Sequence, residues 1–557
     1  MKIFKITLVV FCFFTLGSCT KDLDLTTPDQ FEDANFWTSE NNVRAYSWGF
    51  YNMFLGYGIG TGTSADFYFS TFTDDQAQGA FQAFQVSAAA TNTNWNWEQI
   101  RKANIMIARV RNMSSLSQEA KNHWEGVARF FRALDYFNKT KIFGDVPYIE
   151  NELDISDVNV IYKQRDSRKL VIQKVLEDLD FAIVNLRTTD VHNTINKSIA
   201  YALKARVALY EGTYRKYHTS LGLTADANGL LTQAAAAAGF LIDGNQFSLN
   251  SSYETVYNSL DLSANKQVLL YKKYITGVQG HSIVNYLTST TVMQGLTKSA
   301  VESYTTTDGL PVTQVGGAPL YAGDNGIANV RANRDDRLLK TIANFLAYNG
   351  NLVSGQASST GYVPVKFVNR NTNINGGQND TDAPLFNYAE VLVNYAEALA
   401  ELGTLTQADL DKSVNKLRQR AGVANLKYDG VNVTSGTLGT TIINDSKRPA
   451  SIPALVWEIR RERRTELMMD GFRYDDLMRW AMGANLSVSA TVNTDAFLGA
   501  KVPMSGSVRT NSDGYLMPYT AASARTFLAP KHYLSAIPTG QISLYAPYGG
   551  MAQNPDW

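Results

Sequence analysis

Apolar residues recur at steps of three and four positions along two long parts of the chain, and this spacing is typical of amphipathic helices. The run from 385 to 402 is the most regular. The same spacing predicts helices over 42–55, 97–110, 118–143, 170–186, 199–211 and 410–421. Alanines within 199–211 leave room for another helix to pack closely. The sequence therefore predicts a mainly α-helical scaffold of helix pairs over about 40–250 and 380–480.

Recurring helix pairs are typical of tetratricopeptide-like repeats, although the strict repeat consensus is absent here. Long stretches rich in Gly, Ser, Thr, Asn and Tyr interrupt the pairs, and this composition favours loops with short strands. They cover about 56–96, 253–371 and 484–530. We therefore predict a tetratricopeptide-like helix-pair scaffold that carries long loop-rich insertions.

The predicted helix within 451–480 is unusually rich in charge. Like charges repeat every four positions along it, which weakens an isolated helix; they are Glu458, Glu462, Glu466, Arg460 and Arg464. Residues three apart are neighbours on a helix, so Glu458 is expected to meet Arg461, and Arg463 to meet Glu466. The remaining charges need partners on other helices. We interpret the segment as a structural Arg–Glu network rather than a catalytic carboxylate pair, because one turn of one helix cannot straddle a glycosidic bond well.

The N-terminus has the pattern of a secretory signal peptide. Lys2 and Lys5 precede an apolar run over 6–16, which is too short for a membrane-spanning helix. Residues 16–19, Leu-Gly-Ser-Cys, resemble a bacterial lipobox, in which the cysteine is lipidated and becomes the new N-terminus. We therefore predict a lipoprotein signal peptide over 1–18, an acylated Cys19 that anchors the protein to a membrane, and a single body over 19–557.

Charge and motifs exclude several classes of function. The formal net charge is zero, so the basic surface required for nucleic-acid binding is not expected. The five histidines are far apart, and the chain lacks the common hydrolase, metalloprotease and phosphate-binding motifs. No catalytic residue, metal site or cofactor is predicted.

A longer motif in the charged segment points to a family. The string from Ile459 to Trp480 resembles, without a gap, the C-terminal signature I-x-x-E-R-R-x-E-L-x-x-[DE]-G-x-R-x-x-D-L-x-R-W of the SusD/RagB family. Further matches to family motifs occur at 130–133, 143–147, 308–309, 334–338, 388–398, 415–422, 537–538 and 553–557. Asp336 and Asn387 depart from the usual proline and arginine. The resemblance covers most of the predicted mature chain.

The resemblance implies a SusD-like fold and a binding function. Members of the family are outer-membrane lipoproteins of Bacteroidetes, exposed at the cell surface, that capture a nutrient, usually a glycan, and pass it to a SusC-like TonB-dependent transporter. The acidic run that directs such proteins to the surface is matched in part by Asp22 and Asp24. Two alternatives stay open: a peptide-binding member of the same family, and an all-helical glycoside hydrolase.

Exposed aromatic side chains are the expected sugar-binding groups, because their ring faces cover the apolar faces of pyranoses while polar groups bind the hydroxyls. Such residues are expected in the insertions rather than in the helices. The candidates are Phe81, Trp95, Tyr286 and Tyr321, with Asp74 as a polar partner. Trp97, at the start of a predicted helix, is expected in the core instead.

Overall fold

The computed structural model describes residues 33–58, 66–67, 73–77, 87–288, 292–349, 351–372, 375–488, 495–519 and 525–557. The predicted signal peptide, Cys19 and Phe81 lie outside these residues. Across the described ranges, no helix combines the length and the apolar character needed to cross a membrane.

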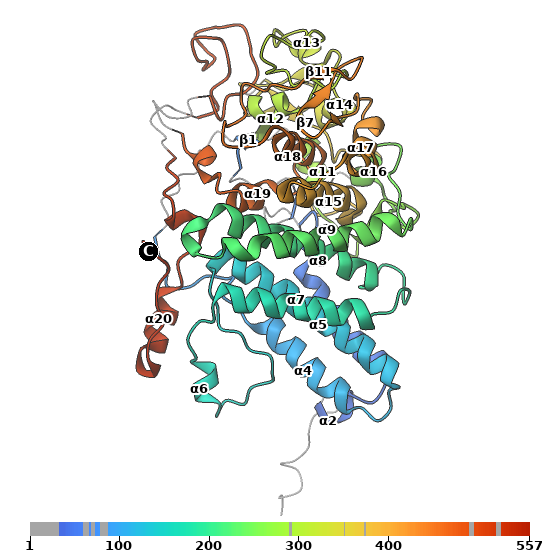
Figure 1. Cartoon of the computed structure of the whole chain (residues 1–557), viewed down its shortest axis with the longest axis vertical. Coiled ribbons are helices and arrows are strands. Elements are labelled where there is room, and N and C mark those ends of the chain that lie inside the picture. Colours follow the sequence, from blue (N-terminus) through green and yellow to red (C-terminus); the bar gives the residue numbers. More distant parts are fainter. Residues whose placement is uncertain are drawn as a thin grey trace, which may run out of the picture.

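Long helices pack on one another in sequence order, and all but the last of them form the lower part of the molecule in Figure 1, with the last lying above them. Each helix contacts its neighbour along the chain, and α9 then packs against a helix from a much later part of the sequence. The helices are α4 (Glu98–Asn112), α5 (Gln118–Phe143), α7 (Arg168–Asn185), α8 (Lys197–Tyr217), α9 (Ala227–Asp243) and α15 (Tyr388–Leu402). This arrangement confirms the predicted mainly helical, tetratricopeptide-like scaffold.

Side-chain caps explain where these helices begin and end. Ser117 and Ser167 cap α5 and α7 by accepting a hydrogen bond from a backbone N–H in the first turn. Gly144 and Gly403 follow the last residues of α5 and α15 with positive φ angles of 74° and 72°, which favour glycine. The predicted stops after 143 and 402 are therefore confirmed.

Four helix assignments differ from the structure. Helix α9 is missed because its alanine-rich sequence has no clear polar face. The helix expected from 385 begins at Tyr388, because 383–387 pairs as a strand and the Asn387 side chain caps the helix. The helix expected over 410–421 is divided at Ser413 into α16 (Gln407–Lys412) and α17 (Val414–Arg420). The segment 42–55 forms α3 (Glu40–Trp48) followed by a 3-10 turn, η1 (Gly49–Met53).

The upper part of the molecule in Figure 1 contains short helices and small sheets with their own hydrophobic core. The paired strands are β1 (Gln76–Ala77) with β4 (Gly295–Leu296), β2 (Val268–Lys272) with β8 (Ala383–Asn387), β3 (Val292–Met293) with β6 (Ala357–Ser358), β5 (Ile342–Leu346) with β7 (Tyr362–Pro364), and β9 (Lys427–Tyr428), β10 (Val433–Ser435) and β11 (Thr441–Ile442) as one sheet. All pairs are antiparallel except β3–β6.

Short helices occur in both parts of the molecule. They are α2 (Asp33–Phe36), α6 (Val158–Ile161), α10 (Thr255–Asn258), α11 (Ile283–Thr288), α12 (Lys298–Ser303), α13 (Ile327–Arg331), α14 (Asp336–Thr341), α19 (Arg473–Arg479) and α20 (Thr539–Tyr545). The 3-10 turns η2 (Thr219–Leu221), η3 (Thr224–Asp226), η4 (Gly483–Leu486), η5 (Lys531–Tyr533) and η6 (Ala546–Tyr548) complete the elements.

The charged helix α18 (Ala454–Glu466) joins the two parts, packing on α15 on one side and on α12, α14 and α17 on the other. Its glutamates find partners on other elements, as expected. Glu462 accepts hydrogen bonds from Arg337 and Arg418, and Glu466 from Arg337 and Arg420. All of these side chains are almost completely buried.

The network also corrects one predicted pair and confirms another. Glu458 and Arg461 form the expected ion pair, with an Oε2–Nε distance of 3.0 Å. Arg463 does not pair with Glu466 but donates to both Asp476 oxygens, at 2.8 and 2.9 Å. The prediction failed because Asp476, on α19, lies closer to the Arg463 guanidinium than Glu466 does.

Candidate functional site

One face of α18 forms part of a cavity of about 430 Å³. Trp457, Arg460, Arg461 and Arg464 all line it, and their spacing of i, i+3, i+4 and i+7 places them on one side of the helix. The apolar residues Leu455 and Ile459 lie on another side and are buried in the main core. The charged helix therefore uses separate faces for packing and for the cavity.

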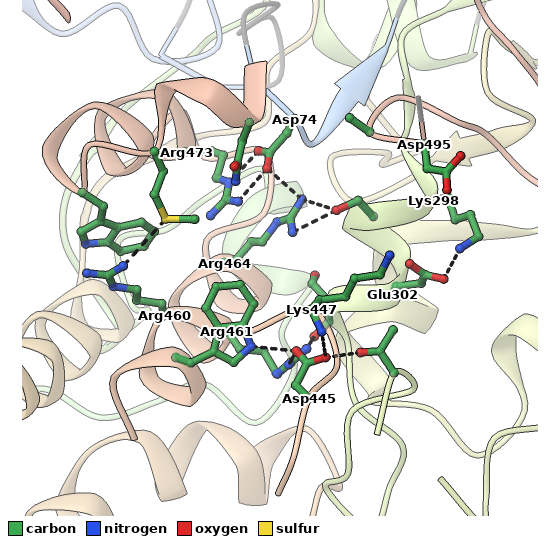
Figure 2. Close-up of a pocket in the computed structure, with 18 residues that line it drawn as sticks. Asp74, Lys298, Glu302, Asp445, Lys447, Arg460, Arg461, Arg464, Arg473 and Asp495 are labelled. Carbon is green, nitrogen blue, oxygen red and sulfur yellow. Dashed lines mark hydrogen bonds and ion pairs between the residues drawn. The ribbon is translucent and has the colours of Figure 1, made fainter. Parts of the chain in front are cut away.

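Segments far apart in the sequence complete the cavity wall (Figure 2). Each of the three predicted insertions contributes to it: the first supplies Asp74, the second supplies residues of α12 and Thr313, and the third supplies residues near 485 and 495. The full lining beyond α18 is Asp74, Lys298, Ser299, Glu302, Ser303, Thr313, Asp445, Lys447, Arg473, Trp480, Met482, Asn485, Asp495 and Ala496.

Asp74 belongs to an ion-pair cluster on one side of the cavity. Arg473 donates from Nε and Nη2 to the two Asp74 oxygens, at 2.7 and 2.8 Å, and Arg464 donates from Nε to Asp75 at 2.7 Å. Burial raises the pKa of Asp74, but the charges of Arg473 and Arg464 outweigh it and hold this pKa well below its usual range. Asp74 is therefore ionised and fixed in place by the two arginines.

Asp445 organises the opposite side of the cavity (Figure 2). Its carboxylate accepts hydrogen bonds from Thr313 Oγ1 at 2.5 Å, from Trp457 Nε1 at 2.7 Å and from the Lys447 backbone N–H at 2.9 Å. It also pairs with Arg461. Burial raises its pKa, but Arg461 and these donors leave the pKa below the usual value. The indole of Trp457 is thus held in one orientation while its side chain stays partly exposed.

The other tryptophan in the wall has a different environment. Trp480 is only 3% exposed, and the guanidinium groups of Arg460 and Arg479 lie 4.3 and 4.6 Å from its ring centroid. Its ring is occupied by cation–π contacts and contributes to packing. Trp457 is consequently the better placed of the two for contact with a ligand.

The chemistry of the cavity favours binding over catalysis. An aromatic surface, hydroxyl groups, an amide and fixed charged groups surround it. A general acid for glycosidic cleavage needs a raised pKa, whereas Asp74 and Asp445 have lowered ones. Throughout the described ranges, His, Cys, Asp and Glu residues form no group of three that can hold a metal ion.

Of the predicted ligand residues that the structure describes, Asp74 alone lines the cavity. Asp74 lines the cavity, but as a buried ion-pair partner rather than as an exposed polar group. Tyr286 lies on α11, partly buried against the upper core, and Tyr321 lies 5.5 Å from the Arg334 guanidinium. Neither tyrosine lines the cavity.

The expectation that Trp95 is exposed is wrong. Its side chain is 8% exposed and packs edge-on against Phe143, with ring centroids 4.9 Å apart. Trp97, expected in the core, is only partly buried. The two tryptophans differ in this way because Trp95 turns inward from the loop that precedes α4, while Trp97 occupies the N-terminal edge of that helix.

Trp457 was missed, although the sequence carried a signal for it. It lies off the apolar stripe of its helix, at the head of the arginine-bearing face. A large aromatic residue on a polar face is a candidate for ligand contact. Loop residues such as Lys298 and Asn485 carried no such signal, because only the folded chain brings them to the cavity.

Comparisons with known proteins agree with this fold. The SusD family model matches residues 285–557, and a second model, described as starch-binding associating with outer membrane, matches residues 61–209. SusD-like protein P38 from Formosa agariphila is 24% identical over 529 residues, which cover 86% of this chain and 92% of that protein.

Solved structures show the same architecture. A SusD-like carbohydrate binding protein from Bacteroides fragilis has a TM-score of 0.70 at 21% identity, covering 91% of this chain and 99% of that one. Surface glycan-binding protein A from Bacteroides fluxus has a TM-score of 0.62 at 16% identity, covering 93% of this chain and 100% of that one. The chain belongs to the SusD/RagB family, a family of carbohydrate-binding proteins associated with the outer membrane.

Proposed function

We propose that this protein captures an oligosaccharide in the cavity beside α18. The observation that carries the proposal is the partly exposed Trp457 indole, fixed by its hydrogen bond to Asp445 among hydroxyl, amide and guanidinium groups. A fixed aromatic ring covers the apolar face of a sugar, and the surrounding polar groups bind its hydroxyls. The family's carbohydrate binding supports this assignment.

We further propose that the captured glycan is delivered to a SusC-like TonB-dependent transporter at the cell surface. The family's association with the outer membrane supports this role. In this proposal the protein acts without catalysis, since two structurally similar proteins are named as carbohydrate- or glycan-binding proteins and arginines hold Asp74 and Asp445 ionised.

Replacing Trp457 with alanine is expected to weaken glycan binding by about 1.5–3 kcal/mol, the scale for one large apolar side chain. The fold is expected to survive, because this side chain is only partly buried. Isothermal titration with oligosaccharides identified on a glycan array, beside thermal melts, measures both effects. Trp457→Phe keeps an aromatic ring but loses the hydrogen bond to Asp445, and it is expected to retain more of the affinity than Trp457→Ala.

Trp48→Ala is the matched control, since this tryptophan is 44% exposed on α3 and does not line the cavity. Its affinity is expected to equal that of the wild type. Unchanged binding by Trp457→Ala would place the glycan elsewhere on the protein. Binding of library peptides instead of glycans would favour the peptide-binding alternative, and release of reducing ends would favour a hydrolase.

Anchoring is proposed to depend on Cys19, the only cysteine left after removal of the predicted signal peptide. Cys19→Ala is expected to abolish incorporation of a fatty-acid label and to release the protein from the membrane fraction. Cys12→Ala, within the part to be removed, serves as the control and is expected to leave labelling intact. A label that persists in Cys19→Ala would contradict the lipobox assignment.

A further inference from the structure

The cavity is rich in cationic groups, yet nearly all of them are already neutralised by carboxylates. The cations in its wall are Lys298, Lys447, Arg460, Arg461, Arg464 and Arg473. A wall with several unpaired cations would suit uronic-acid or sulfated glycans, because their anionic groups need charged partners. The pairing of each cation therefore decides which class of glycan the cavity fits.

The arginines of α18 are paired with carboxylates inside and behind the wall. Arg460 Nη2 lies 2.9 Å from Glu401, which is completely buried, and Arg464 Nε lies 2.7 Å from Asp75. Arg461 is shared between Asp445 and Glu458. The side chains of these three arginines are at most 12% exposed. Water therefore contributes little to the solvation of their guanidinium groups.

The remaining cations follow the same pattern. Arg473 pairs with Asp74 through two hydrogen bonds, and Lys298 pairs with Glu302 one helical turn away on α12 (Figure 2). Within the part of the chain that the structure describes, Lys447 alone among the wall cations has no ion-pair partner, and it is exposed. Asp495 also lines the cavity.

Hydrogen-bonding capacity remains after the charges are paired. Arg473 Nη1 and the Asn485 side-chain amide make no hydrogen bond within the described residues, and both line the cavity. An uncharged hydroxyl can bind such a donor without displacing a carboxylate. An anionic ligand would instead face Asp74, Glu302 and Asp445, and among the described wall cations Lys447 alone could pair with it without giving up a carboxylate.

We infer that the cavity selects uncharged glycans and disfavours uronic-acid or sulfated ones. This inference rests on the proposed glycan capture and adds the charge class of the ligand. It also identifies Glu302 as a specificity-determining residue: its ion pair with Lys298 is on the cavity wall, and each side chain is 20% exposed, so removal of the carboxylate leaves a cation that a ligand can reach.

The test compares neutral hexose oligosaccharides with uronic-acid oligosaccharides of equal length by isothermal titration. The wild type is expected to bind the best neutral ligand at least tenfold more tightly than any uronate, with little dependence on salt. Glu302→Gln is expected to raise uronate affinity threefold to tenfold by leaving Lys298 unpaired. The preference of the protein for the neutral ligand over the uronate is therefore expected to narrow in this variant.

Glu254→Gln is the matched control, because Glu254 pairs with Lys340 at 3.3 Å away from the cavity. Glu254→Gln is expected to leave the affinity for the neutral ligand and the affinity for the uronate unchanged. Tighter uronate binding by the wild type, lost in Trp457→Ala, would overturn the charge inference while supporting glycan capture in this cavity. An unchanged uronate affinity in a folded Glu302→Gln would also overturn it. Failure of every glycan to bind would overturn the proposed function and this inference together.

Discussion

Arg337→Ala is expected to lower the free energy of unfolding by about 3–5 kcal/mol, the usual cost of removing one partner from a buried ion-pair network. Arg337 is 1% exposed and contacts three carboxylates, those of Asp335, Glu462 and Glu466. Burial lowers its pKa, but these carboxylates raise the pKa well above the usual value. Glu462 and Glu466 keep a second arginine in the variant, whereas Asp335 is left buried with no ion-pair partner among the residues that the structure describes.

Arg187→Ala is a matched control, since Arg187 also contacts three carboxylates, those of Glu40, Glu119 and Asp190. Its side chain is 22% exposed and Glu119 is 63% exposed, so solvent screens these pairs. The expected loss is about 1 kcal/mol or less. Chemical denaturation of both variants measures the difference. Equal losses would show that burial does not set the strength of these networks.

The charged helix α18 has two roles in this family member. Its glutamates face the interior and connect α18 to α14 and α17, while its arginines at 460, 461 and 464 face the cavity. The same helix therefore stabilises the junction of the two parts and supplies the cavity with fixed charges. A substitution of a glutamate on the interior face is expected to affect stability. A substitution on the face that lines the cavity is expected to affect binding.

Local periodicity explains why most helices could be predicted and why the site could not. The spacing of apolar residues in α5 and α15 reflects burial along one helix, and glycines at 144 and 403 mark the ends. The pairing of Arg463 with Asp476 depends instead on how α18 and α19 dock, which no periodicity records. The cavity likewise needs three insertions to converge, which no local pattern records, although Trp457 on the polar face of α18 carried a signal of its own.

Trp95 shows that the composition of a stretch does not decide whether its aromatic residues contact a ligand. It lies at the end of an Asn- and Thr-rich stretch, and such stretches are usually exposed. The neighbouring sequence does not show that Phe143, at the end of α5, covers one edge of the indole. A loop aromatic is therefore a candidate for binding only after its packing is known.

Trp95→Ala is expected to lower the free energy of unfolding by about 3–5 kcal/mol, because it opens a cavity in the core between the start of α4 and the end of α5. The variant loses the contacts with Phe143 and with the Trp97 ring, whose centroid lies 5.5 Å away. Glycan affinity of the folded variant is expected to equal that of the wild type, since Trp95 does not line the cavity.

Trp97→Ala is the internal comparison for this prediction. Its side chain is only partly buried, and the Lys139 ammonium lies 5.3 Å from its ring centroid. The expected loss is about 1–2 kcal/mol, because part of the indole is already in contact with water in the folded protein. Thermal melts beside isothermal titration separate stability from binding for both variants. A stable Trp95→Ala with weakened glycan binding would restore Trp95 as a ligand contact and contradict the assignment of the site to the cavity beside α18.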